Sequence, residues 1–288
     1  MPSQNDTKQQ QFRETIDRLV EWSKRYAEKV LSLPNDSFEK TVMVALALCF
    51  ACAVVVSASA VALKPLQVSN KALDMKKNIL DVVGLLEEGE DIDEAFKQFE
   101  TRVVDLETGE YVDTVDAGTY DQRKAAKDST MSVAIERKQD IAGIKRRENY
   151  AKVYLLKEGG QVKAIILPVH GYGLWSTMYG FLALEGDGET VIGINFYDQA
   201  ETPGLGGEVV NPKWRALWKG KKVFDESGEP RLGLIKGNVD PSRPGAEYQV
   251  DGLAGATLTS VGVTNLVRYW MGRQGYALYL EKIRSEKG

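Results

Sequence analysis

The chain has 288 residues, of which 43% are hydrophobic and 27% are charged. This size allows one large domain or two small ones, with a sizeable buried core. The formal net charge is −4, so the composition gives no basis for nucleic-acid binding or for strong electrostatic steering of a partner. We therefore expect no nucleic-acid partner.

The first 40 residues are predicted to form a polar and amphipathic extension. Residues 1–10 are polar and are expected to be disordered. Apolar residues then recur near helical spacing between Gln11 and Leu33, with charged residues between them. This pattern predicts an amphipathic helix that lies either on a membrane surface or against a partner protein. Residues 34–37, Pro-Asn-Asp-Ser, are expected to end it.

Residues 41–63 are predicted to form a transmembrane helix, because these 23 residues carry no charge and lie between Lys40 and Lys64. As a helix the segment would span roughly 34 Å at about 1.5 Å per residue, enough for a hydrocarbon core of about 30 Å. A cleaved signal peptide is the alternative, since Ala58-Ser-Ala60 resembles a cleavage site. However, the 40 residues ahead of it contain seven acidic residues, whereas a signal peptide begins with a short basic region. The pattern favours an uncleaved anchor.

The charges beside this segment do not orient it. Four Lys or Arg residues lie within 20 residues on each side, so the positive-inside rule gives no preference. Both cysteines of the chain, Cys49 and Cys52, fall inside the segment. Two thiols cannot complete a four-ligand metal site alone, so we interpret them as small apolar residues of the membrane helix and expect no metal.

Residues 64–288 are predicted to form one α+β domain with a largely antiparallel sheet. A linker is expected after Pro65, and the charged stretch 131–147 lacks apolar periodicity. Glycine-rich turns between the first four strands are typical of antiparallel hairpins. The predicted helices are Asn70–Leu86, Asp91–Phe99, Asn211–Trp218, Thr259–Met271 and Tyr276–Ile283. The predicted strands are Lys152–Leu156, Val162–Val169, Met178–Leu184, Val191–Tyr197, Lys222–Phe224 and Gly233–Lys236.

A turn of small residues leads into the helix expected near residue 259. Gly255 and Ala256 precede three hydroxyl residues, Thr257, Thr259 and Ser260. Thr259 or Ser260 is expected to cap the helix, because its side-chain oxygen can accept from unpaired N–H groups of the first turn. A helix N-terminus behind small residues is also suited to a phosphate group. The alternative is an ordinary capped helix after a tight turn.

This stretch resembles the flavinylation motif of proteins that carry FMN, through its phosphate, on a threonine hydroxyl. In that motif an Asp, two further residues and a small or hydroxyl residue precede Gly-Ala-Thr, whose Thr is the acceptor. The matching residues here are Asp251, Ala254, Gly255, Ala256 and Thr257. Position 254 is often Ser or Thr in such proteins and is Ala here, which leaves the acceptor unchanged. The resemblance implies one covalent FMN on Thr257.

Two more glycine-rich loops, His170–Ser176 and Glu201–Gly207, match neither a dinucleotide fingerprint nor a Walker motif. A flavin ring needs apolar side chains on its faces and backbone groups at its polar edge. Leu174, Trp175 and Leu205 could supply the apolar faces. The alternative is that both loops are only tight turns between strands, with the tryptophan in the core.

Four motifs, in order and spacing, resemble the C-subunit family of the sodium-translocating NADH:quinone reductase. The match runs from about residue 40 to the end of the chain. The G subunit of the Rnf complex shares the Thr-Pro-Gly-Leu-Gly and Gly-Ala-Thr motifs and is the alternative family. The matching motifs are Gly-Tyr-Gly-Leu-Trp-Ser at 171–176, Glu-Thr-Pro-Gly-Leu-Gly-Gly-Glu at 201–208, Asn-Pro-Lys-Trp at 211–214, and 251–257.

The resemblance implies a single-pass subunit of a sodium-pumping NADH:ubiquinone reductase in the inner membrane, with a cytoplasmic N-terminus and a periplasmic FMN domain. The flavin would relay electrons toward a neighbouring membrane subunit, so no catalytic acid or base is predicted on this chain. A neutral threonine hydroxyl is a poor nucleophile, which implies that a separate flavin transferase drawing on FAD attaches the cofactor. Asp251 would serve its recognition or place the loop.

The cofactor contacts implied are Thr257, with Asp251, Gly255, Ala256 and Thr259 beside it, and Leu174, Trp175, Ser176, Thr202, Gly204 and Leu205 from the two loops. His170 could hydrogen-bond the flavin or its phosphate, but a histidine in a turn without a redox role is the favoured interpretation. Two other functions stay open. One is an anchored assembly subunit without a cofactor, and the other is a standalone membrane flavoprotein reductase.

Overall fold

The computed structural model describes residues 32–87 and 89–285, together with residues 17–18, 21–22, 24–26 and 28–30. The chain divides into two compact units, Met1–Asn70 and Lys71–Gly288. The disorder expected for residues 1–10 lies outside the described residues. So does part of the amphipathic helix expected over 11–33, whose described residues up to residue 30 are helical.

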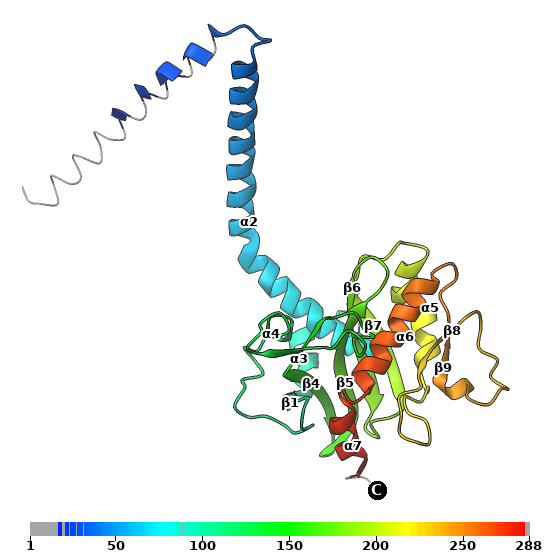
Figure 1. The fold of residues 1–288 in the computed structure, drawn as a ribbon. Coiled ribbons are helices and arrows are strands. Elements are labelled where there is room, and N and C mark those ends of the chain that lie inside the picture. The colour runs from blue at the N-terminus through cyan, green and yellow to red at the C-terminus, as the bar shows by residue number, and fades with distance from the viewer. Residues whose placement is uncertain are drawn as a thin grey trace, which may run out of the picture. The chain divides into compact units, whose positions relative to one another are not determined.

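A single helix, α2, covers Phe38–Val82 and is drawn in blue to cyan in Figure 1. It contains the uncharged segment 41–63, whose side chains are almost all exposed, and both cysteines. Among the described residues it is the one helix long and apolar enough to cross a membrane. The linker expected after Pro65 is wrong, because Pro65 lies inside the helix. One proline removes one backbone hydrogen bond, and a helix with good hydrogen bonds on both sides of it can continue past that loss.

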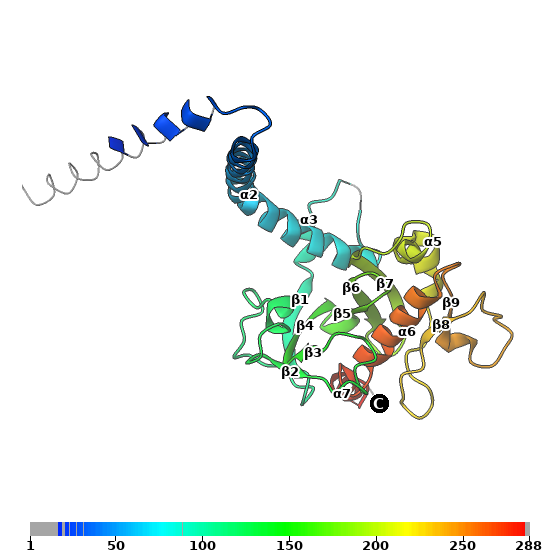
Figure 2. The same cartoon turned by 45° about the horizontal axis from the view of Figure 1, so that its top comes forward.

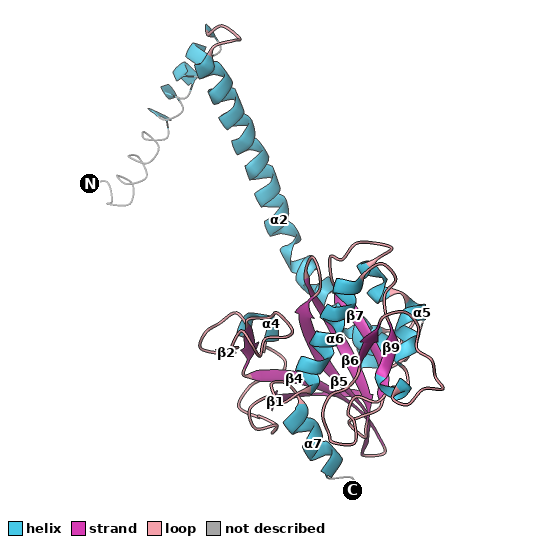
Figure 3. Cartoon of the chain, turned by 45° about the vertical axis from the view of Figure 1, so that its right-hand side comes forward, coloured by secondary structure: helices cyan, strands magenta, loops and turns pink. Residues whose placement is uncertain are grey.

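The second unit is built on a five-stranded antiparallel sheet of order β1-β4-β5-β6-β7, seen in magenta in Figure 3. The four strands expected after residue 150 are confirmed. The edge strand β1 was not expected, because its sequence, Phe-Glu-Thr-Arg-Val-Val-Asp, is mostly polar and only half buried. The strands are β1 Phe99–Asp105, β4 Tyr150–Glu158, β5 Gln161–Tyr172, β6 Thr177–Glu185 and β7 Val191–Asp198.

The sheet is buried on both faces. Successive side chains of a strand point to opposite faces, so in β5 Ile165 and Leu167 enter one core while Ala164 and Ile166 enter the other. The smaller core is closed by the last turns of α2, through Ile79 and its neighbours, and by α3 (Ile92–Phe96). This two-sided burial explains why the middle of β5 reads as an unbroken apolar run.

Helix α6 (Thr257–Met271) lies against the other face, packed on β5 and beside β8 (Figure 2). Together with α7 (Ala277–Ser285) it confirms the two C-terminal helices. The strand expected at Lys222–Phe224 forms only isolated bridges. The short elements are α4 Gln122–Ala125, β2 Ser132–Ala134, β3 Arg146–Glu148, η1 Gly206–Val210, α5 Pro212–Arg215, η2 Ala216–Trp218, β8 Gly233–Ile235, η3 Ala246–Tyr248 and β9 Gln249–Asp251.

Candidate functional site

Helix α6 begins at Thr257, and its N-cap residue, Ala256, offers no side-chain hydrogen bond. The expectation that Thr259 or Ser260 caps the helix is therefore wrong. Both residues lie inside the first turn, where their hydroxyl groups have other partners. The N-cap position of α6 thus carries no side-chain oxygen. Such an oxygen would compete with a bound anion for the N–H groups of the first turn.

The three hydroxyl groups near this turn differ in their bonding. Thr259 is buried, and its Oγ1 donates to Oε2 of Glu201 over 2.7 Å. Ser260 is buried as well, and its Oγ accepts from the backbone N–H of Leu253 over 3.0 Å. The side chain of Thr257 is exposed and makes no hydrogen bond within the described part of the chain. Thr257 therefore presents the one uncommitted hydroxyl of the three.

Gly255 has a φ of +72°, a left-handed conformation that disfavours side chains. A Cβ at this position would also lie 2.9 Å from Cδ2 of Leu205, so the loop after β7 touches the turn before α6. Ala256 is buried behind it. Position 255 thus requires glycine, because the backbone is left-handed there and Leu205 leaves no room for a side chain.

Glu201 joins the three glycine-rich stretches. It is only 4% exposed. Besides the bond from Thr259, its carboxylate accepts from the backbone N–H groups of Leu174 at 3.1 Å, Trp175 at 3.0 Å and Ser176 at 3.3 Å. Burial raises the pKa of Glu201, but the Thr259 hydroxyl and the three amides outweigh it and hold that pKa below its usual value. Glu201 is therefore an anion at neutral pH.

The stretch His170–Ser176 contains the end of β5 and the hairpin connection 173–176, because β5 runs through Tyr172 and β6 starts at Thr177. Helix α6 packs directly on it: a Cβ on Gly262 would lie 2.6 Å from the backbone oxygen of Tyr172. The hydroxyl of Ser176 accepts from the N–H of Ala200 over 2.8 Å. The hairpin, the loop after β7 and the start of α6 thus form one assembly.

The assembly that contains Thr257 exposes several apolar side chains. Trp175 is 66% exposed, Leu258 61% and Val261 50%. Leu205 and Leu174 are also exposed, so the expectation that Trp175 belongs to the core in the turns-only alternative is wrong. Exposed apolar side chains beside an unbonded hydroxyl fit a flat cofactor ring held close to its point of attachment.

The remaining predicted contacts have structural partners. Oδ1 of Asp251 accepts from the N–H of Val239, and the backbone oxygen of Asp251 accepts from the indole N–H of Trp214 over 2.9 Å. The exposed turn at Thr202 and Gly204 is closed by bonds from two downstream N–H groups to the backbone oxygen of Thr202. Asp251 thus shapes the loop through one carboxylate oxygen and its backbone oxygen.

His170 lies in strand β5 rather than in a turn, which corrects that part of the prediction. Its ring stacks on Tyr179 with centroids 5.4 Å apart and lies 4.9 Å from the ring of Trp270. Burial, and to a lesser extent the charge of Arg123, lowers the pKa of His170 to about 4. His170 is therefore a neutral packing residue at ordinary pH.

Sequence reasoning missed three residues of the site. Glu201 opens a quoted motif, but its role needs the fold, since its donors come from distant segments. Leu258 and Val261 are one helical turn apart and exposed. Their spacing in the sequence suits the core-facing side of a helix equally well, so only their exposure in the structure shows that they belong to the surface beside Thr257.

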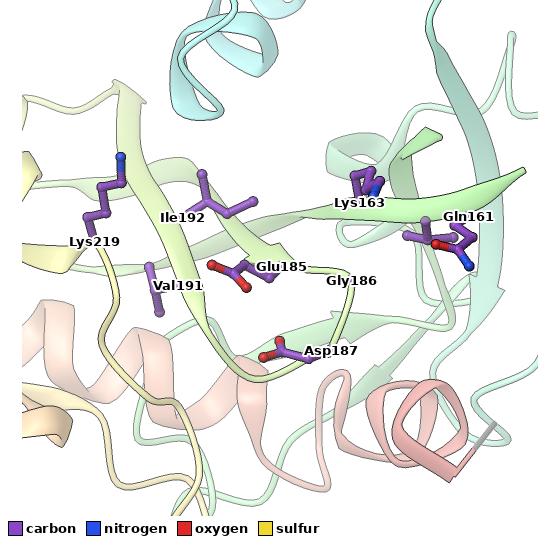
Figure 4. A pocket seen from close by; sticks show the side chains of 9 residues that line it. Gln161, Lys163, Glu185, Gly186, Asp187, Val191, Ile192 and Lys219 are labelled. Carbon is purple, nitrogen blue, oxygen red and sulfur yellow. The ribbon is translucent and has the colours of Figure 1, made fainter. Parts of the chain in front are cut away.

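A separate cavity of about 490 Å³ lies at the turn between β6 and β7 and the beginning of β5 (Figure 4). Its lining includes Lys163, Glu185, Asp187 and Lys219. Strand β5 starts beside this cavity at Gln161 and ends 11 positions later, at Tyr172, beside the hairpin that contacts α6, a separation of roughly 36 Å at about 3.3 Å per residue. The cavity is therefore distinct from the assembly around Thr257.

Fold and site together define an FMN-binding domain behind a single membrane helix. The family model "FMN-binding domain" matches residues 173–272, from the β5–β6 hairpin to the end of α6. The C subunit of the Na(+)-translocating NADH-quinone reductase from Pseudomonas aeruginosa is 51% identical over 254 residues, covering 87% of this chain and 97% of the relative. Its counterpart from Vibrio vulnificus is 49% identical over 251 residues, with the same two coverages.

A solved structure, NqrC from Shewanella oneidensis, is 30% identical with a TM-score of 0.70 and covers 75% of this chain and 99% of its own. The chain belongs to the C-subunit family of the Na(+)-translocating NADH-quinone reductase. It is an FMN-binding, single-pass membrane subunit of that reductase and works with further membrane subunits. The family assignment sets aside the Rnf protein and the cofactor-free assembly protein.

Proposed function

We propose that this chain carries one FMN through a phosphoester to Oγ1 of Thr257 and relays electrons to a neighbouring membrane subunit. The observation that carries the proposal is the bonding of the three hydroxyl groups. Thr259 and Ser260 are buried and bonded, whereas Thr257 is exposed and unbonded. Thr257 is also the residue that matches the acceptor of the flavinylation motif.

The start of α6 suits the phosphate of such a linkage. Free N–H groups and the helix dipole at an N-terminus attract anions, and here the N-cap residue, Ala256, makes no side-chain hydrogen bond to them. Gly255, which is exposed, and Ala256 leave the backbone open to close approach. These residues would hold the phosphate, while the attachment itself comes from Thr257.

The apolar side chains beside Thr257 would bind and orient the ring. Leu174, Trp175 and Leu205 come from the two loops, and Leu258 and Val261 from α6. Their role is to exclude water from the ring faces and to fix its distance from the next carrier. When bound, FMN supplies the one- and two-electron chemistry, so the protein needs no acid or base of its own.

Attachment requires a separate flavin transferase. A threonine hydroxyl must be activated to attack a phosphorus atom, and the one carboxylate of the motif, Asp251, already accepts a hydrogen bond from Val239. In the reaction we propose, Oγ1 of Thr257 forms a bond to the FMN phosphorus of FAD, the pyrophosphate bond breaks, and AMP leaves. Asp251 keeps the loop in the shape that the transferase recognises.

The orientation in the membrane is part of the same proposal: the FMN domain lies in the periplasm and the N-terminus in the cytoplasm of the inner membrane. It rests on the family resemblance, since the flanking charges are balanced. Protease treatment of intact spheroplasts tests it through a C-terminal epitope tag. Loss of the tag is expected, and a tag that survives in sealed spheroplasts contradicts a periplasmic domain.

Peptide mass spectrometry tests the attachment site directly. Trypsin should release residues 237–268 as one peptide, because Arg243 is followed by proline. We expect this peptide to carry the mass of one FMN, with fragment ions that place it on Thr257. An unmodified peptide from yellow protein, or fragments that place the group on another residue, would show that the assignment is wrong.

A further inference from the structure

We infer that Glu201 is the positioning residue of the FMN site: its carboxylate fixes the β5–β6 hairpin loop, residues 173–176, against the first turn of α6, and its negative charge makes the flavin harder to reduce. The inference rests on the proposed function, because it requires the flavin beside Thr257. Glu201 itself touches only protein groups, so it positions the site through the elements that it holds and acts on the flavin through the field of its charge.

The contacts of Glu201 leave it no freedom to move. Three backbone N–H donors come from the hairpin loop, and one hydroxyl donor comes from Thr259. Two glycines make room for it: a Cβ on Gly173 would lie 2.5 Å from Oε1, and one on Gly206 would lie 2.9 Å from Oε2. Glu201 is therefore the side chain that bonds the backbone of Leu174 and Trp175 directly to the first turn of α6.

The charge of Glu201 has no cationic partner. All its donors are neutral, and within the described residues no lysine or arginine forms an ion pair with it. A buried anion is poorly screened by water, so it repels an electron added nearby. The described loops around Thr257 also hold no cation, since residues 170–176, 199–207 and 251–261 contain neither lysine nor arginine. The uncompensated charge should therefore lower the reduction potential.

The substitution Glu201→Gln removes the negative charge but keeps a side chain of the same size. Its amide oxygen can still accept from the hairpin N–H groups, and its NH₂ group can donate to Oγ1 of Thr259, so the assembly should persist. Glu208→Gln is the matched control. Glu208 follows this loop, in η1, where its Oε2 accepts from the side-chain amide of Asn211 over 2.6 Å, and within the described residues no hydrogen bond joins its side chain to the hairpin.

The charge is tested by redox titration of the full-length, flavin-loaded protein in detergent, followed by visible absorbance. We expect Glu201→Gln to increase the equilibrium constant for flavin reduction about tenfold, which raises the reduction potential by about 59 mV for a one-electron step. Glu208→Gln should leave the potential unchanged. A Glu201→Gln potential equal to that of the wild type overturns the electrostatic half of the inference, since a merely structural residue would give that result.

The positioning is tested on flavin-free protein made without a transferase, which keeps it independent of where the flavin is attached. Hydrogen exchange at the N–H groups of Leu174, Trp175 and Ser176 should be at least tenfold faster in Glu201→Ala. Glu201→Gln should restore most of the protection. Unchanged exchange in Glu201→Ala overturns the positioning role. A flavin found away from Thr257 would instead contradict the proposed function and leave this result standing.

Discussion

The indole N–H of Trp214 donates to the backbone oxygen of Asp251 over 2.9 Å, across 37 residues of sequence. This bond joins the Asn-Pro-Lys-Trp motif, which contains the start of α5, to the strand that leads into the turn before α6. Trp214 is itself buried and packs edge-on against Trp218. Two motifs that look independent in the sequence are therefore parts of one scaffold.

Trp214→Phe should destabilise the domain and loosen the turn. The substitution removes the N–H and leaves a buried carbonyl without its donor, which costs about 1–3 kcal/mol of unfolding free energy. Chemical denaturation measures this change when the unfolding free energies of the variant and the wild type depend equally on denaturant concentration. The control is Leu217→Ala, since Leu217 lies in the same segment but is 38% exposed. Equal unfolding free energies of Trp214→Phe and wild type would show that this hydrogen bond does not stabilise the domain.

Thr257→Ala should abolish covalent flavin while leaving the fold intact, because it removes an exposed hydroxyl that makes no hydrogen bond. Thr257→Ser keeps a hydroxyl and should retain some attachment. In-gel flavin fluorescence after denaturation, with thermal melts of each variant, measures both effects. Ser260→Ala is the control, and it should keep its flavin despite losing the bond from Leu253. A fluorescent band from Thr257→Ala would show that another residue carries the flavin.

His170 should make the stability of the domain depend on acid pH. Its folded pKa of about 4 lies below the unfolded value of roughly 6.5, so the unfolded chain binds more protons between these values. Stability is therefore complete above pH 6.5 and falls, by about 3 kcal/mol in all, as the pH drops toward 4. The fall in stability toward pH 4 should be steeper in wild type than in His170→Phe, because every other group titrates in both chains, and denaturation across this range measures the difference.

Glu148 should give the opposite dependence. It is fully buried, and burial raises its pKa to about 7, while Gln122 donates to one of its oxygens. Here the folded chain binds more protons, so the contribution is complete below pH 4.5 and is lost as the pH rises through 7. Glu148→Gln should therefore be more stable than wild type at pH 8, by roughly 3 kcal/mol. A variant less stable than wild type at pH 8 would contradict this protonation scheme.

Truncation should distinguish the two parts of α2. A chain that starts at Lys71 keeps the turns that carry Ile79, Leu80 and Val82 and should be soluble and folded. A chain that starts at Val83 loses these residues, each large aliphatic side chain being worth about 2–5 kcal/mol, and should unfold or aggregate. Size-exclusion chromatography and circular dichroism measure both outcomes. A well-folded chain from Val83 would show that the smaller core does not need the helix.

The sequence predicts the central strands and the C-terminal helices because their patterns are local. The run Ala164 to Val169 is apolar enough to identify a buried strand, and glycines mark the hairpin turns. Strand β1 has no such pattern, since it is an edge strand that depends on pairing with β4. The continuation of α2 past Pro65 was missed for a similar reason, because a local helix breaker was given more weight than the helix on both sides.

For the site, the sequence identified the stretches but not their connection. Thr257 and the apolar loop residues were chosen from motifs, and the structure brings those stretches together. The capping role given to Thr259 failed because α6 begins at Thr257, and the hydroxyl of Thr259 instead donates to Glu201, 58 residues earlier in the chain. Short-range rules assign such a hydroxyl to its own helix. Only a folded chain shows that a distant carboxylate has taken it.

The two-sided burial of β5 has a consequence for how the domain responds to damage. Ile165 and Ile166 are adjacent in the chain, yet each belongs to a different core. Neither core can melt without disturbing the strand on which the other is built, so the domain should unfold in one cooperative transition. A substitution that weakens the smaller core, such as one at Ile79, should therefore raise the population of fully unfolded chains, and the core on the other face of the sheet unfolds with it.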